Sequence, residues 1–161
     1  AAVLNAGMSQ RGDLATLPME KFDRTFDVNV RAVVLGIRAC IGPMRERGGG
    51  AIAVTSSTSG LGGDPGLWPY NTAKAAVLNL VRAAALDLGP LGIRVNAVRP
   101  GIIETDIHAS GGRPERIAGL GPACPLGRAG DPEEVAQSIF WLISNDASYV
   151  TGSIVDVSGG R

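Results

Sequence analysis

The sequence has little of the chemistry that disulfides and metal centres require. Its 161 residues include only two cysteines, Cys40 and Cys124, and one histidine, His108. Neither cysteine belongs to a Cys-x-x-Cys pattern or has a plausible base beside it, so we expect buried or incidental thiols rather than a disulfide or a nucleophile. No His/Cys/Asp/Glu cluster is visible, so no metal site is predicted. His108 lies in a segment rich in glycine and serine, and we expect it to face solvent.

The chain also lacks an excess of charge and long apolar runs. Fifteen Lys and Arg residues balance fifteen Asp and Glu residues, with no block of like charge, which argues against nucleic acid or an anionic membrane as a partner. The apolar runs are far shorter than the roughly 20 residues that span a bilayer, and the first residues lack the pattern of a signal peptide. We therefore expect a cytoplasmic protein.

The composition that is present favours a turn-rich α/β protein of one domain over residues 1–161. Hydrophobic residues make up 45% of the chain, with 23 glycines and 10 prolines, and this length is sufficient for a substantial core. Short apolar runs predict buried strands at residues 1–4, 51–55, 93–98 and 153–157. Helical patterns lie between them, and such alternation implies a parallel sheet with right-handed crossovers.

Helical periodicity predicts three long helical regions and one short helix. One broken helix or two consecutive helices should reach Arg45, with Pro18 at the first helical position. A second helix should cover residues 70–88, and a short one residues 115–120. Asp131 followed by proline and, three residues on, Glu134 is typical of a helix start. The stretch from Ile102 to Gly130, which contains the short helix, is rich in glycine and proline, and we expect residues 104–130 to form a substrate-binding lid.

The strongest functional signal is the pair Tyr70 and Lys74. On a helix these residues are one turn apart on one face, so the ammonium can act on the phenol. An isolated pair of this kind is more often part of a surface helix. Here, however, Ser57 lies thirteen residues upstream of Tyr70, where the strand 51–55 ends and where open α/β sheets bind ligands. A substrate oxygen between the two hydroxyls would meet two donors.

Several motifs together make the chain resemble the short-chain dehydrogenase/reductase family from end to end. Besides the residues above, the resemblance rests on Asn5-Ala6-Gly7, Asn29, Arg99-Pro100-Gly101, Thr105, Thr151-Gly152 and Asp156. It implies a Rossmann-like doubly wound parallel sheet, of which only the later strands and helices are here. The glycine-rich loop of the family's first half has no counterpart, because Gly48-Gly49-Gly50 precedes a strand instead of following one. Residues 107–112 and Gly127-Arg128 look most like glucose or ribitol dehydrogenase-like members.

The resemblance also implies roles for individual residues. Catalytic residues would be Asn29, Ser57, Tyr70 and Lys74. Residues that bind the cofactor would be Asn5, Ala6, Gly7, Tyr70, Lys74, Pro100, Gly101, Ile103 and Thr105. The cofactor would be NAD or NADP, with the preference open because its determinant belongs to the absent portion. The family interval selects Ser57 among its hydroxyl neighbours. Asn29 would hold a water that relays protons, although a mid-helix asparagine also marks kinks.

The implied chemistry requires the phenol of Tyr70 to have a lower pKa than an ordinary tyrosine. A phenol of pKa ~10 must become more acidic by roughly two to three units to accept a proton from an alcohol near neutral pH. A unit charge at ~4 to 5 Å has an effect of about this size. We therefore expect Lys74 to be the main influence on that pKa, helped by the positive charge of the oxidised nicotinamide.

The function implied is an NAD(P)-dependent oxidoreductase acting on a small alcohol, polyol or ketone. A 3-oxoacyl thioester reductase is an alternative within enzymes. A different alternative is an incomplete or degenerate module that acts as an oligomerising or binding piece, because the strand ending at Asn5 would present an unpaired edge unless further residues cover it. The resemblance also implies a homo-oligomer, either a tetramer or a dimer.

Overall fold

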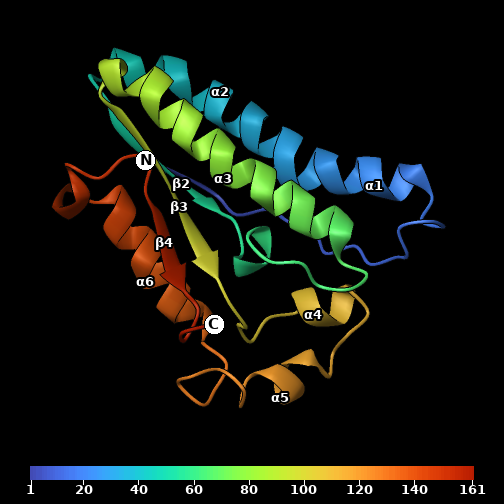
Figure 1. Cartoon of the computed structure of the whole chain (residues 1–161). Helices are drawn as coiled ribbons and strands as arrows, with labels where there is room; N and C mark the ends of the chain where they lie inside the picture. Colours follow the sequence, from blue (N-terminus) through green and yellow to red (C-terminus); the bar gives the residue numbers. More distant parts are fainter.

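A four-stranded parallel sheet with helices on both faces forms the computed structural model, which describes residues 1–161 apart from the side chain of Ser110 (Figure 1). The strands are β1 (Ala2–Leu4), β2 (Gly50–Thr55), β3 (Ile93–Pro100) and β4 (Ile154–Val157), and they are neighbours in that order. Every neighbouring pair is parallel. The carboxyl ends of all four strands therefore lie along one edge of the sheet, as expected for the α/β class that the sequence predicted.

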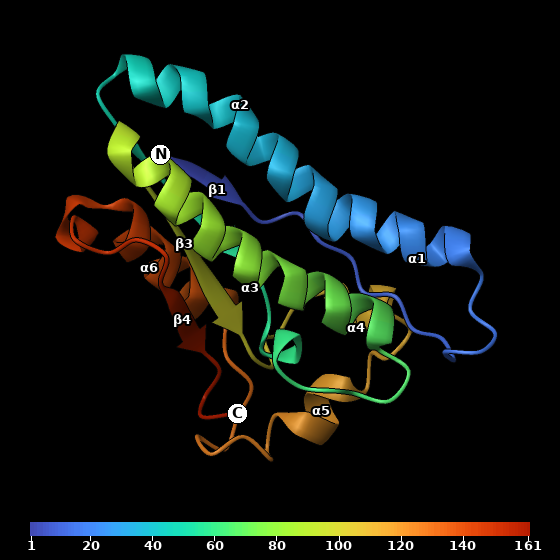
Figure 2. The ribbon, with the colours of Figure 1, turned by 45° about the horizontal axis from the view of Figure 1, so that its top comes forward.

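The long helices are divided between the two faces of the sheet. Figures 1 and 2 show α2 and α3 side by side on one face and α6 on the other. The long helices are α1 (Met19–Phe26), α2 (Ala32–Glu46), α3 (Trp68–Leu88) and α6 (Pro132–Ile143). A π-helical turn (Asp27–Arg31) joins α1 to α2. The shorter helices are α4 (Ile107–Ser110), α5 (Arg116–Leu120) and the 3-10 turns Thr58–Gly60, Gly89–Leu91 and Asn145–Ala147. This arrangement confirms the doubly wound fold.

Several predicted boundaries are confirmed and others change. The two consecutive helices expected up to Arg45 are α1 and α2. Pro18, however, is not the first helical residue: its backbone is extended, and its carbonyl accepts a hydrogen bond from the Lys21 amide at 3.0 Å. Pro18 is therefore the N-cap. The short helix expected at residues 115–120 is α5, whereas α4 was not expected, since the segment around His108 has no helical periodicity.

The larger hydrophobic core lies between α2, α3 and the sheet. Val77 and Val81 of α3 are fully buried against strand residues that include Val54 of β2 and Val95 of β3. A smaller core lies on the opposite face, where Val135 and Leu142 of α6 pack near Val98 of β3. The central strands are thus covered on both faces, which explains why their sequences are continuous apolar runs rather than alternating ones.

The structure also shows the state of the two cysteines and whether any helix is suited to crossing a membrane. Cys124 is buried, Cys40 is partly exposed, and both are free thiols. No helix within the described part of the chain combines the length and the apolar character needed to cross a membrane. β1 is an edge strand of the sheet, and its residue Val3 is 44% exposed.

Polar side chains of β3 fasten the segment that leads into β4. Asn96 is fully buried; its Nδ2 donates to the Val150 carbonyl at 2.8 Å, and its Oδ1 accepts from the Ser153 amide at 3.0 Å. Nη1 of Arg94 donates to the carbonyls of Leu142 at 2.8 Å and of Val150 at 3.2 Å. These bonds satisfy the last turn of α6 and set the position of β4 beside β3.

We predict that Asn96→Ala lowers the free energy of unfolding of the full-length protein by about 2 to 3 kcal/mol, because it removes both hydrogen bonds of a fully buried side chain and leaves the half-buried Ser153 amide without this acceptor. Chemical denaturation measures this loss. Asn145→Ala, which removes an exposed amide from the turn after α6, is the control and should change stability by less than about 0.5 kcal/mol. Equal effects of the two substitutions would contradict the importance given to the Asn96 bonds.

Candidate active site

A cleft of about 1170 Å³ is lined by residues at the carboxyl ends of the strands and in the segment that carries α4 and α5. Most of the residues singled out in the sequence lie on its wall. These are Asn5, Gly7, Ser57, Tyr70, Lys74, Pro100, Gly101, Ile103 and Thr105. Ala6 and Asn29 do not line the cleft. The structure thus brings residues from four separate segments of the chain to one place.

The segment that follows β2 packs directly on the backbone of α3 at Lys74. The buried Ser56 hydroxyl donates to the Lys74 carbonyl at 3.0 Å, and the Lys74 ammonium donates to the Thr55 carbonyl at 2.9 Å. A Cβ atom at Gly60 would lie 3.0 Å from the Lys74 carbonyl carbon and 3.1 Å from the Ala75 nitrogen. Only glycine fits this contact without displacing the helix. Sequence analysis missed these contacts of Ser56 and Gly60.

The hydrogen bonds of this segment also show which of its hydroxyls is directed to Tyr70. The Ser56 hydroxyl is used by the helix backbone, and the Ser59 hydroxyl donates to Asp64 at 3.3 Å. The Ser57 hydroxyl accepts from the Ser59 amide at 3.2 Å and lies near enough to the Tyr70 phenol to lower the pKa of that phenol. Ser57 is therefore the hydroxyl of this group that meets the phenol, which agrees with its selection from the sequence interval.

The electrostatics of Tyr70 differ from the expectation. Burial has the largest effect and raises the pKa of the Tyr70 phenol above 10.0, while the hydrogen bond with Ser57 and the charge of Arg116 act in the opposite direction. The expectation that Lys74 dominates this pKa is wrong here. The Lys74 ammonium lies over the Tyr70 ring, 5.7 Å from its centroid, and is directed to the Thr55 carbonyl rather than to the phenol oxygen.

Lys74 is itself perturbed by burial. Its side chain lies at the cleft wall, yet the residue is only 3% exposed. The loss of solvation lowers the pKa of its ammonium to about 8. A group with this pKa is still mostly protonated at neutral pH. Lys74 therefore brings a positive charge beside the Tyr70 ring at neutral pH, and it loses that charge under mildly alkaline conditions.

Asn29 lies in the π-helical turn behind the cleft and is fully buried. Its Oδ1 accepts from the Met8 amide at 3.2 Å, and its Nδ2 donates to the carbonyls of Met8 at 2.9 Å and Thr25 at 3.0 Å. A Cβ at Gly7 would lie 3.1 Å from the Asn29 Oδ1 and 3.4 Å from the Lys74 ammonium. The asparagine thus ties the loop after β1 to the bend between α1 and α2. The water relay implied by resemblance stays a prediction.

The loop after β3 is positioned by β4. The Gly101 amide donates to the Val157 carbonyl at 3.0 Å, and a Cβ at Gly101 would lie only 2.9 Å from the Ser158 Cα. Arg99 forms an ion pair with Asp156. These contacts place Pro100 and the residues after it on the cleft wall. Ile103 is buried, whereas Thr105 is exposed on that wall.

The two ends of the expected lid, residues 104–130, are hydrogen bonded to each other. The Glu104 amide donates to the Gly130 carbonyl at 2.9 Å, and the Gly130 amide donates to the Ile102 carbonyl at 2.9 Å. The segment therefore leaves the sheet and returns to it at one point. Whether it closes over a substrate is not tested by these contacts, and its role stays a prediction.

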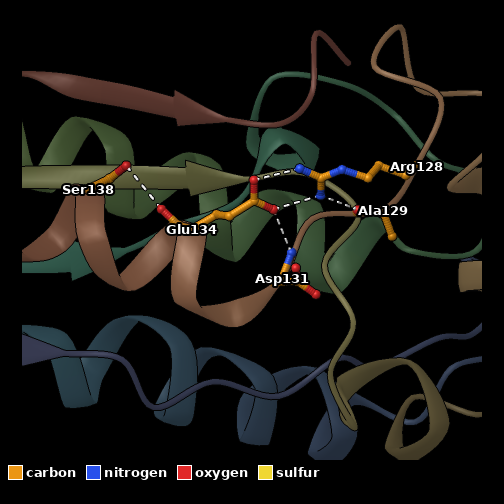
Figure 3. A network of polar contacts seen from close by, with 5 residues as sticks. All are labelled: Arg128, Ala129, Asp131, Glu134 and Ser138. Carbon is orange, nitrogen blue, oxygen red and sulfur yellow. Dashed lines mark hydrogen bonds and ion pairs between the residues drawn. The ribbon is translucent and has the colours of Figure 1, made fainter.

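A polar network fastens the far end of this segment to α6 (Figure 3). Nη1 and Nη2 of the Arg128 guanidinium donate to the Glu134 carboxylate, at 2.8 and 2.7 Å, and the Asp131 amide donates to the same carboxylate at 2.8 Å. The hydrogen bonds with Arg128 have the largest effect in lowering the pKa of Glu134 to about 2. The helix start predicted at Asp131 is confirmed as a capping box.

Two further residues of the cleft wall had no signal in the sequence. His108 was expected to face solvent, but it is half-buried on the cleft wall, and its Nε2 lies 3.0 Å from the Ile103 carbonyl. The expectation was wrong because the unforeseen helix α4 turns the imidazole inward. Arg116 of α5 also lines the cleft, and its charge lowers the pKa of both Tyr70 and His108.

Comparison with known proteins gives a consistent result. A family model described as Enoyl-(Acyl carrier protein) reductase matches residues 1–161. The chain is 43% identical to a cyclopentanol dehydrogenase of Comamonas sp. (strain NCIMB 9872), over 99% of this chain and 64% of that protein. It is 40% identical to a 3-alpha-(or 20-beta)-hydroxysteroid dehydrogenase of Mycobacterium bovis, over 98% of this chain and 58% of that protein.

Solved structures are also similar to this chain. A short-chain type dehydrogenase/reductase from Mycobacterium marinum has a TM-score of 0.91 and 38% identity, over 98% of this chain and 63% of that one. A 7 alpha-hydroxysteroid dehydrogenase complexed with NADH and 7-oxo glycochenodeoxycholic acid has a TM-score of 0.91 and 35% identity, over 98% and 62%. The chain thus spans slightly less than two thirds of these proteins.

We predict that Gly60→Ala lowers the free energy of unfolding by about 1 to 3 kcal/mol, because the new methyl group meets the backbone of α3, which cannot yield as a side chain can. Gly63→Ala in the same loop is the matched control, since a Cβ there meets nothing within 4 Å. Chemical denaturation of both variants measures the difference. A loss at position 63 as large as that at position 60 would refute the close contact.

We also predict that burial of Lys74 makes stability rise with pH. The pKa of Lys74 is about 8 in the folded protein, whereas the ordinary pKa of a lysine, as in the unfolded chain, is 10.5. Between these pH values the unfolded state binds more protons, so the stability contributed by Lys74 increases with pH. Relative to Lys74→Met, the wild type should gain about 2 to 3 kcal/mol as pH rises through this window. Denaturation at several pH values measures this gain.

The exposed Lys21 provides the control for this pH series. Lys21→Met removes an ammonium from the surface instead of from the interior, so a gain with pH that is common to both variants would not be due to the burial of Lys74. A difference between wild type and Lys74→Met that stays constant with pH would mean that the folded protein holds the Lys74 proton as firmly as the unfolded chain does.

Proposed function

This chain belongs to the short-chain dehydrogenase/reductase family, and from this membership we propose that it forms the catalytic part of an NAD(P)-dependent oxidoreductase. The full-length protein transfers hydride between the nicotinamide cofactor and a small alcohol, polyol or ketone. The observation that carries the proposal is the meeting of the Ser57 hydroxyl and the Tyr70 phenol in the cleft, with the ammonium of Lys74 beside the phenol ring.

The cleft has features that fit the nicotinamide end of such a cofactor. The Thr55 hydroxyl is buried at the cleft wall without a hydrogen-bond partner among the described residues, and the Lys74 ammonium donates to one carbonyl, which leaves two of its N–H groups for hydroxyls of a ligand. The residues that would hold the cofactor are Asn5, Ala6, Gly7, Tyr70, Lys74, Pro100, Gly101, Ile103 and Thr105. When bound, the cofactor supplies or accepts the hydride, and its oxidised form adds a positive charge.

In the reducing direction, Tyr70 donates a proton to the carbonyl oxygen of the substrate. The raised pKa of the phenol suits this role, because the group is fully protonated at neutral pH. The Ser57 hydroxyl donates a hydrogen bond to the same oxygen as negative charge develops on it. Two donors held by different elements, the end of β2 and the start of α3, thus converge on one atom.

In the oxidising direction, Tyr70 must first give up its proton. Burial opposes this, whereas Ser57 and Arg116 favour it. The Lys74 charge lowers the pKa of the phenol more when the ammonium donates to a hydroxyl close to the phenol oxygen than when the ammonium lies over the ring. Lys74 therefore assists the reaction through its charge, and it does so best below the pH at which it deprotonates, about 8.

A reductase of acyl thioesters is the second candidate. It is supported by the description of the matching family model. Assays of neutral alcohols, ketones and acyl thioesters side by side distinguish the two. The first candidate is favoured by the cyclopentanol dehydrogenase and the two hydroxysteroid dehydrogenases among the similar proteins.

We extend the proposal to the lid and to assembly. Residues 104–130 form the substrate-binding lid, which is supported by their place above the cleft. The protein forms a homo-oligomer, a tetramer or a dimer, which is supported by exposed apolar side chains on α2 and α3: Leu35 at 55% and Leu86 at 80%. The cytoplasmic location expected from the sequence stays a prediction.

We predict that Tyr70→Phe in the full-length protein lowers kcat by about 10²- to 10⁴-fold, the usual contribution of a general acid or base. The affinity for NADH or NADPH, measured by fluorescence, should change little. Tyr149→Phe is the matched control, since this second tyrosine is fully exposed, and it should retain activity. Substantial turnover by Tyr70→Phe would remove Tyr70 from the role of proton donor.

A further inference from the structure

The wall of the cleft carries an excess of positive charge, although the chain as a whole has fifteen basic and fifteen acidic residues. Six basic and two acidic side chains line the cleft. The basic residues are Arg11, Lys74, Arg99, Arg113, Arg116 and Arg161, and the acidic ones are Asp64 and Asp106. A cleft lined by one sign of charge raises the local concentration of ligands of the opposite sign.

Several of these basic groups already have close partners. Arg99 forms an ion pair with Asp156, and Arg113 forms one with Glu115. Arg11 donates to the Pro65 carbonyl at 2.9 Å. These side chains are engaged in holding the cleft wall.

Arg116 is different. Its side chain is only 17% exposed, yet among the described residues its sole ionic partner is Asp64, with 3.7 Å between Nη2 and Oδ2. This distance is too long for a hydrogen bond, and the same carboxylate oxygen already accepts from the Ser59 hydroxyl at 3.3 Å. No described residue accepts a hydrogen bond from the Arg116 guanidinium. A mostly buried group with five N–H donors therefore lacks acceptors of its own.

The position of Arg116 links it to the reacting end of the cleft. Its positive charge acts on both Tyr70 and His108, which face the cleft from α3 and α4. Asp64, the ionic partner of Arg116, also accepts from Ser59, two residues after Ser57, so Arg116 lies near the end of the cleft that holds the Ser57 and Tyr70 hydroxyls. Arginine binds carboxylates through two parallel hydrogen bonds, which suits a guanidinium with free donors.

We propose that the substrate is an anion, a hydroxy acid or the corresponding oxo acid, whose carboxylate binds Arg116 while its hydroxyl or carbonyl oxygen lies at Ser57 and Tyr70. The carboxylate replaces the loose contact between Arg116 and Asp64. This inference rests on the proposed oxidoreductase function. In oxidation, the hydride leaves the carbinol carbon for the oxidised cofactor and the hydroxyl proton passes to Tyr70; the carboxylate keeps its charge throughout.

The test uses the full-length wild-type protein and matched pairs of substrates that differ only in charge. Suitable pairs are 3-hydroxybutanoate with its methyl ester and 3-hydroxycyclopentane-1-carboxylate with its methyl ester, with cyclopentanol as a neutral reference. We expect kcat/KM for the acids to exceed that for the esters by about tenfold or more, the factor that a hydrogen bond between charged groups contributes.

Arg116→Met separates the two effects of the arginine. Loss of its field on Tyr70 lowers oxidation of acid and ester alike, whereas loss of carboxylate binding raises KM for the acid alone. We expect the preference for the acid over the ester to fall at least about tenfold, and Arg116→Lys to restore part of it. Arg38→Met removes an exposed arginine from α2, away from the cleft, and should leave the preference unchanged.

Three results would overturn the inference. Equal kcat/KM for acids and esters in the wild type would refute an anionic substrate. A loss in Arg116→Met that is equal for acid and ester would show that Arg116 acts on Tyr70 only. Weaker binding of NADH or NADPH by Arg116→Met without substrate would assign Arg116 to the phosphates of the cofactor. If the wild type neither binds nucleotide nor oxidises any of these alcohols, the proposed function itself fails, and this inference fails with it.

Discussion

The close contact between the end of β2 and the backbone of α3 at Lys74 is the constraint on which the cleft depends. Gly60 brings the turn after β2 within van der Waals distance of the helix, and the buried Ser56 hydroxyl binds the carbonyl of Lys74 at 3.0 Å. In the same contact, the Lys74 ammonium donates a hydrogen bond to the Thr55 carbonyl at the end of β2. Because the end of β2 and the first turns of α3 are joined in this way, the Ser57 hydroxyl and the Tyr70 phenol are held near each other without depending on a flexible loop.

Burial acts on both ionisable groups of this contact in the direction of their neutral forms. It raises the pKa of Tyr70 and lowers that of Lys74. The resting site therefore holds a protonated phenol beside an ammonium that is charged at neutral pH, which is the state that a proton donor requires. Removing the phenol proton needs additional positive charge near its oxygen. The direction of the reaction is thus sensitive to every charge that enters or leaves the cleft.

The sequence was sufficient for features that depend on local pattern and interval. The parallel strands, the two consecutive helices before β2, the capping box at Asp131 and the separation of Ser57 from Tyr70 all follow from spacing. Contacts between segments were not accessible. Nothing in a Gly/Pro-rich stretch predicts that α4 turns His108 inward or that α5 brings Arg116 to the cleft. The sign of the Tyr70 pKa shift was also missed, since spacing shows that a lysine is near but not that burial outweighs it.

On the proposed function, the segment of residues 104–130 connects the charge of the substrate to the acidity of the Tyr70 phenol. Its two ends are joined to each other beside Gly130 and fastened to α6 through Arg128 and Glu134, so Arg116 is carried on a loop with a fixed base. An anion bound to Arg116 cancels much of the positive field that this group exerts on Tyr70. The phenol then holds its proton more firmly. If the substrate is anionic, its binding therefore favours proton donation by Tyr70, and the site is better suited to reducing an oxo acid than to oxidising a hydroxy acid.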